Sequence, residues 1–128
     1  MSIEIEHDFA AEADQVWAIV GVPDRVDWVP GIEGCVYDGE VRRFNLPGAG
    51  QLAERIVQLD NEARFISYSV IESTPPLDAH LASIQVVATD AGCRMVWRTE
   101  VEPAAVEPFI EQSMQLALKQ IQHILEGN

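Results

Sequence analysis

Between Gly34 and Glu102, runs of alternating apolar and polar residues are separated by short turn signals. Such runs are typical of half-buried strands. The turns are Asp38-Gly39, a Leu-Pro-Gly loop at 46–48, Asp60-Asn61, Thr74-Pro75-Pro76 and Asp90-Ala91-Gly92. Connections this short join antiparallel neighbours, because a parallel pair needs a crossover of a dozen or more residues. The segment therefore predicts six strands in an antiparallel meander.

The segments on either side of this meander predict one more strand and three helices. Residues 2–9 alternate like a half-buried strand, whereas residues 12–20 have the 3.6-residue period of a short amphipathic helix. Pro23 can open a second short helix that runs through about Trp28. After Pro103, apolar residues recur at helical spacing and predict one long amphipathic helix to about Glu126.

This order predicts an α+β fold in a single domain, residues 1–128. A curved seven-stranded antiparallel sheet would bury its apolar face against the long C-terminal helix, with two short helices after the first strand. At this length roughly two thirds of the unfolded surface can be buried, so the core needs neither a metal nor a disulfide. The sheet and the helix can touch fully or can leave a cavity between them.

The composition excludes several classes of partner. The chain has 8 basic and 21 acidic residues, a net charge of -13, which argues against nucleic acid and anionic membranes. Cys35 and Cys93 stand alone, and they predict reduced thiols in a cytosolic protein, with a disulfide as the minor alternative. The scattered histidines predict no metal site, and we expect no cofactor. Without a signal peptide or a run of about 20 apolar residues, the expected localisation is cytoplasmic, with no membrane insertion.

Three stretches, VWAIVGVPDRVDWVPGIEGC, AERIVQLDNEARFISYSVIE and MVWRTEVEP, resemble the START-like helix-grip superfamily. The nearest group is the polyketide cyclase/dehydrase-like (SRPBCC) group, and the resemblance covers nearly the whole chain. It implies a sheet that wraps the C-terminal helix and leaves a deep pocket for a small hydrophobic ligand.

The stretch NLPGAGQLAERIVQLDNEARFISYSVIE is distantly similar to the gate-loop hairpin of the plant abscisic-acid receptors, in the same superfamily. The similarity implies that the loop 45–50 closes over the pocket, opposite a latch at 73–77. The receptors' carboxylate-binding lysine falls near Val29, and their ligand-contacting asparagine falls near Ala117. The similarity therefore implies a pocket with a lid, and does not extend to that ligand.

Glu54 is the sharpest candidate for a site residue. Alternation places it on one face with Leu52 and Ile56, and the resemblance turns this face toward the pocket. A hairpin centred on residues 47–50 puts Arg43 opposite Glu54, within reach of an ion pair. A carboxylate on an apolar face needs a polar partner, water or a raised pKa. Ligand contact, proton transfer and a purely structural pair with Arg43, or with Arg55 if the register slips, all remain open.

Tyr68 and His80 are the other polar groups on predicted inner faces, and each is either a ligand contact or a satisfied core residue. On the last helix, Phe109, Ser113 and Ala117 follow one another at four-residue steps, so they form one stripe that meets the cavity. The complete predicted ligand-binding set is Arg43, Leu46, Pro47, Leu52, Glu54, Tyr68, His80, Trp97, Phe109, Ser113 and Ala117.

Three functions fit these residues. The first is the binding of a small hydrophobic or aromatic molecule, lipid or polyketide-like, in a pocket gated by the loop 45–50. The alternative is an enzyme of the polyketide cyclase/dehydratase type that uses Glu54 with His80 or Tyr68 as acid and base. In the third, large side chains fill the cavity and the protein acts as an interaction partner, for example as a homodimer.

Overall fold

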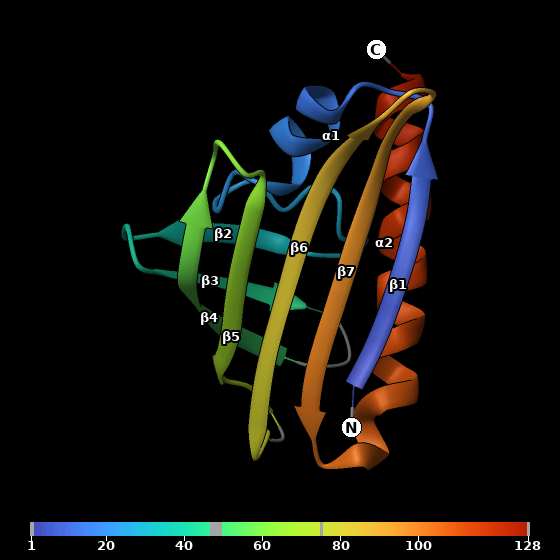
Figure 1. The fold of residues 1–128 in the computed structure, drawn as a ribbon. Coiled ribbons are helices and arrows are strands. Elements are labelled where there is room, and N and C mark those ends of the chain that lie inside the picture. Colours follow the sequence, from blue (N-terminus) through green and yellow to red (C-terminus); the bar gives the residue numbers. More distant parts are fainter. Residues whose placement is uncertain (1, 47–49, 75, 128) are drawn as a thin grey trace.

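The computed structural model describes residues 2–46, 50–74 and 76–127. A curved sheet lies against one long helix (Figure 1). The elements follow in the order β1 (Ser2–Phe9), α1 (Ala13–Val20), β2 (Glu33–Tyr37), β3 (Val41–Leu46), β4 (Gly50–Asp60), β5 (Phe65–Glu72), β6 (Ala79–Thr89), β7 (Gly92–Glu102), the 3-10 turn η1 (Ala104–Val106) and α2 (Glu107–Glu126).

Within the described residues the strands form one seven-stranded antiparallel sheet, in the order β1-β7-β6-β5-β4-β3-β2. The predicted α+β fold, with its curved sheet and long C-terminal helix, is confirmed. Two irregularities in β4, at Ala53/Glu54 and at Ile56/Gln58, shift its register against β5. Such bulges bend a strand and increase its twist. The sheet curls accordingly, and β2 and β3 run crosswise to β6 and β7 in Figure 1.

The second short helix predicted at residues 23–28 is wrong, because this segment forms successive turns. Its backbone bonds are single three-residue steps, such as Arg25 N–H to Val22 O and Val29 N–H to Val26 O. A single turn gains too few hydrogen bonds to offset its nucleation cost. Burial of Trp28 determines this segment instead: its ring is almost fully enclosed, and its indole N–H donates to Arg25 O at 2.9 Å.

The main hydrophobic core lies where α1, β1, β5 to β7 and the second half of α2 meet. Its largest fully buried side chains include Val16, Ile66, Ile84, Met95 and Ile121. α2 lies behind β1 and β7 in Figure 1 and packs chiefly on β1, α1 and η1. The inner faces of β3, β4 and β5 therefore extend beyond the helix.

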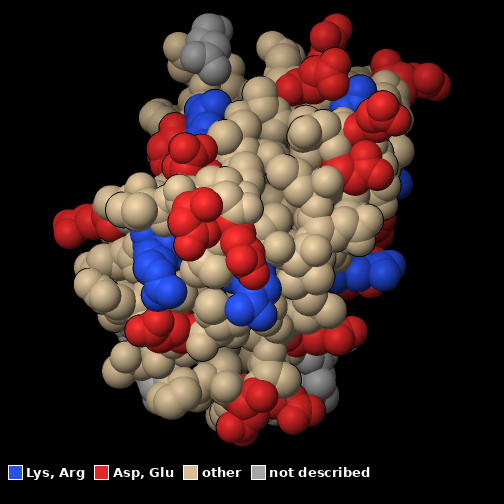
Figure 2. Space-filling model, turned by 90° about the vertical axis from the view of Figure 1, so that its left-hand side faces the viewer, with Lys and Arg blue, Asp and Glu red and all other residues tan. Residues whose placement is uncertain are grey.

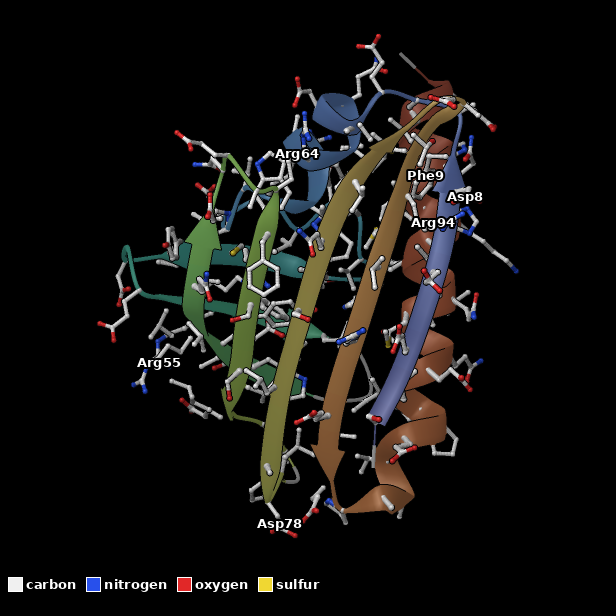
Figure 3. The ribbon with its side chains drawn as sticks, in the orientation of Figure 1. Asp8, Phe9, Arg55, Arg64, Asp78 and Arg94 are labelled. Atoms are coloured by element: carbon white, nitrogen blue, oxygen red, sulfur yellow. The ribbon has the colours of Figure 1, made fainter. Side chains whose placement is uncertain are left out.

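The outer face of the sheet carries exposed ion pairs between neighbouring strands. Arg94 of β7 lies beside Asp8 of β1 in Figure 3, with Nε to Oδ1 at 2.8 Å, and this bond holds the pKa of Asp8 below its usual value. Cys35 and Cys93 are both free thiols. In the part of the chain that the structure describes, no helix is both long and apolar enough to cross a membrane.

Candidate functional site

A cavity of about 370 Å³ lies between the inner face of the sheet and the first half of α2. Most of its wall is apolar. The sheet contributes Arg42, Phe44, Leu46, Leu52, Glu54, Tyr68, Val70, His80, Trp97 and Thr99. The loops contribute Val26, Trp28, Val29, Ile32, Ser73, Thr74 and Leu77. The η1 turn and α2 contribute Ala105, Val106, Phe109, Ile110, Ser113, Met114 and Ala117.

The structure brings most of the predicted ligand-binding residues together around this cavity. Those that line it are Leu46, Leu52, Glu54, Tyr68, His80, Trp97, Phe109, Ser113 and Ala117. Pro47 lies outside the described residues. The large side chains that the third interpretation would use to fill the cavity, Phe44, Trp97, Phe109 and Met114, form part of its wall.

Arg43 lies outside the cavity, and the predicted Arg43–Glu54 pair is wrong. The observed register places Arg42 opposite Glu54 and Arg43 opposite Ala53. Because side chains alternate along a strand, a shift of one residue moves an arginine to the other face of the sheet. The exposed Arg43 guanidinium bonds Glu72 at 3.0 Å. The alternative with Arg55 does not form either: Arg55 projects outward from the sheet in Figure 3, does not line the cavity, and pairs with the exposed Glu40.

Arg42 is the main site residue that sequence reasoning missed. Phe44 and Leu46 follow it at two-residue steps on the same strand, and both line the cavity. Since residues two apart share a face, these two apolar side chains were the signal that Arg42 points inward.

The Arg42–Glu54 ion pair is the strongest polar interaction in the wall. Arg42 Nε lies 2.8 Å from Glu54 Oε1, and the two side chains are only 3% and 11% exposed. Arg42 Nη1 donates to Pro23 O at 3.1 Å, and the guanidinium carbon lies 4.9 Å from the centre of the Tyr68 ring. The arginine is therefore held by a carboxylate, a carbonyl and an aromatic face.

Tyr68 is buried beside this pair, and its hydroxyl accepts a hydrogen bond from Trp97 Nε1 at 3.1 Å. Burial raises the pKa of Tyr68 well above its usual value, and the negative charge of Glu54 raises it further. The phenol is therefore neutral near pH 7, and none of the described residues accepts a hydrogen bond from it.

His80 is held in one tautomer. Its Nδ1 accepts a hydrogen bond from Val70 N–H at 3.1 Å, so in the neutral ring the proton lies on Nε2. Burial lowers the pKa of His80 from 6.5 to about 4. The imidazole is therefore uncharged at neutral pH. Among the described residues, no cluster of His, Cys, Asp and Glu side chains could hold a metal ion.

The chain belongs to the family described as polyketide cyclase / dehydrase and lipid transport, whose model matches residues 1–126. No curated protein sequence matches it. Among solved structures, an uncharacterized protein from Bacillus thuringiensis is 24% identical, with a TM-score of 0.81 over 97% of this chain and 96% of that one. Norcoclaurine synthase from Thalictrum flavum is 25% identical, with a TM-score of 0.76 over 100% of this chain and 87% of that enzyme. The same enzyme has been solved in complex with dopamine and hydroxybenzaldehyde, where the identity is 22% and the TM-score 0.73.

Two neighbouring arginines on β3 give a matched test of the buried ion pair. We expect Arg42→Gln to lower the free energy of unfolding by about 3–5 kcal/mol, because it leaves the buried Glu54 carboxylate without its partner. Arg43→Gln should cost less than about 1 kcal/mol, because its pair with Glu72 is exposed. Urea unfolding of both variants measures the difference. Equal costs would show that the Arg42–Glu54 pair is not buried.

The lowered pKa of His80 predicts a pH-dependent stability. The unfolded chain binds a proton at this residue below pH 6.5, whereas the folded chain resists it down to about pH 4. The contribution of His80 to the free energy of unfolding is therefore fully present above pH 6.5 and is lost as the pH falls toward 4. Between pH 7 and pH 4 the wild type should lose roughly 3 kcal/mol more than His80→Gln, which cannot titrate. Parallel profiles from urea unfolding would contradict this assignment.

Proposed function

We propose that this protein binds a small hydrophobic or aromatic molecule, lipid or polyketide-like, in the cavity between the sheet and α2. The main support for this proposal is the cavity itself, an apolar space of about 370 Å³ with a few polar groups converging on it. Small-molecule sites have this character, with volumes of about 300–1,000 Å³. Glu54, Tyr68, His80, Thr99 and Ser113 supply the polar contacts.

The comparisons support the class of ligand. Lipid transport and polyketide cyclisation stand in the description of the family. Norcoclaurine synthase, a structural neighbour, has been solved with two small aromatic molecules. A ligand of this kind would stack on Trp28 and Trp97, whose ring centres lie 5.5 Å apart in the cavity wall.

The polar groups favour binding over acid–base catalysis. An efficient general acid or base has a pKa near the working pH. Burial moves the pKa of His80 down to about 4 and that of Tyr68 upward, while the Glu54 carboxylate is bound to Arg42. Tyr68 and His80 are thus stabilised in the uncharged form that each has at neutral pH. The cyclase or dehydratase alternative would be favoured if the bound compound were converted during incubation.

The proposal includes a lid at residues 45–50. Leu46 is half-buried and lines the cavity, while Pro47, Gly48 and Ala49 lie outside the described residues. Ser73, Thr74 and Leu77, from the connection between β5 and β6, line the cavity as well. A Cβ placed on Gly50 would lie 3.7 Å from Thr74 Cβ, so the base of the first loop is next to the second.

Native mass spectrometry of the freshly purified protein tests the binding function. We expect a discrete added mass that leaves on unfolding. Ser113→Phe should abolish it, because the new ring enters the cavity from α2, whereas Gln115→Phe on the exposed face of the same helix should retain it. A bare mass in the wild type, with no thermal shift across a library of aromatic and lipid-like compounds, would overturn the proposal.

The lid is tested by the rate of ligand release. We expect Leu46→Gly to increase the dissociation rate of 2-naphthamide several-fold, because it removes apolar contact at the mouth of the cavity. Stopped-flow fluorescence can follow release, since Trp28 and Trp97 line the site. Leu59→Gly, at an exposed leucine outside the cavity, is the control for general destabilisation. Equal rates in the wild type and Leu46→Gly would mean that the loop does not gate the cavity.

A further inference from the structure

We infer that the cavity selects ligands whose polar group is an uncharged hydrogen-bond donor, such as a hydroxyl or an amide, and discriminates against both acids and amines. This inference rests on the proposed binding function and names the class of ligand more narrowly. It follows from the pairing of the two charged side chains in the wall, Arg42 and Glu54, with each other.

The described part of the cavity wall has no uncompensated charge. Among the described residues that line it, the ionisable ones are Arg42, Glu54, Tyr68 and His80. Arg42 and Glu54 neutralise each other at 2.8 Å. Tyr68 and His80 are uncharged near neutral pH, because burial disfavours their charged forms.

Glu54 retains one open acceptor. Its Oε1 is bound by Arg42, and no described residue donates a hydrogen bond to Oε2. The Glu54 side chain is 11% exposed and lines the cavity. A ligand donor can therefore complete the hydrogen bonding of Glu54.

Arg42 offers little to an acid. Its side chain is only 3% exposed, its Nε is bonded to Glu54, its Nη1 is bonded to Pro23 O, and its guanidinium lies over the Tyr68 ring. A ligand carboxylate would compete with Glu54 for this arginine, and displacing Glu54 would leave a buried carboxylate without a partner. A ligand ammonium at Oε2 would lie close to the positive charge of Arg42. An uncharged donor meets neither penalty and avoids the cost of removing an ion from water.

The exterior reinforces the discrimination against acids. The chain has a net charge of -13, and Asp and Glu side chains are spread over the face in Figure 2. A field of this sign lowers the local concentration of anions near the protein. The same field attracts cations. A weaker affinity for the amine than for the amide would therefore have to come from the cavity wall and not from the outer charge.

Three probes with one skeleton separate the possibilities: 2-naphthamide, 2-naphthoate and 2-naphthylmethylammonium, titrated at pH 7.5 by tryptophan fluorescence and calorimetry. We expect the amide to bind the wild-type protein at least tenfold more tightly than either ion. Ionic strength is varied so that the effect of the outer field can be separated from that of the wall.

Glu54→Gln should change the preference in a specific direction, because it leaves the Arg42 charge uncompensated. We expect naphthoate to gain at least tenfold in affinity, so that the amide loses its advantage. Glu72→Gln removes the same charge from the exposed pair with Arg43 and should leave the series unchanged. A merely structural role for Glu54 would weaken all three probes alike and would contradict the inference.

The outcomes distinguish this inference from the function on which it rests. Wild-type protein that binds either ion as tightly as the amide overturns the inference and leaves the binding function standing. Failure of every probe, together with a bare native mass, overturns the binding function as well. Where Glu54→Gln does not fold, the wild-type series and the charge of the co-purified compound decide, and an ionised compound would contradict the selection.

Discussion

One helix is too narrow to cover this sheet, and the rest of the architecture follows from that mismatch. Seven strands spaced by about 4.8 Å span about 29 Å between the outer two, whereas a helix with its side chains is about 10–12 Å across. The chain covers part of the difference by curling the sheet at the β4 bulges and by placing α1 over one end. The uncovered inner face of β3, β4 and β5 borders the cavity.

The polar part of the wall is organised as one connected chain of contacts. Glu54 on β4 bonds Arg42 on β3, the guanidinium covers Tyr68 on β5, and the Tyr68 hydroxyl accepts from Trp97 on β7. Trp97 in turn packs against Trp28 in the turns after α1. Because each member holds the next, this part of the wall is ordered by its own contacts, which under the proposed binding function would lower the ordering cost of binding.

Periodicity was sufficient to predict the strands, the long helix and the inner faces, because burial repeats along each element. Cys93, Met95, Trp97, Thr99 and Val101 are all buried, as their alternation indicates. Properties that depend on the exact register of one strand against the next were harder to predict. The centre of the β3–β4 hairpin cannot be read from a loop with several possible turn residues, and an error of one position exchanged Arg43 for Arg42. The turns at 22–31 depend on Trp28, whose burial is a tertiary contact that no local pattern contains.

The largest fully buried side chains of the core and the side chains that line the cavity are different residues. None of the largest fully buried side chains, such as Ile66, Ile84 and Ile121, lines the cavity. A substitution at a half-buried lining residue such as Leu52 or Ser113 therefore reshapes the space without opening a hole in the packed half, whereas buried lining residues such as Trp28 and Trp97 belong to both. Under the proposed binding function, substitutions at such half-buried positions could change the preferred ligand over evolutionary time while folding stability stays above the threshold that selection enforces.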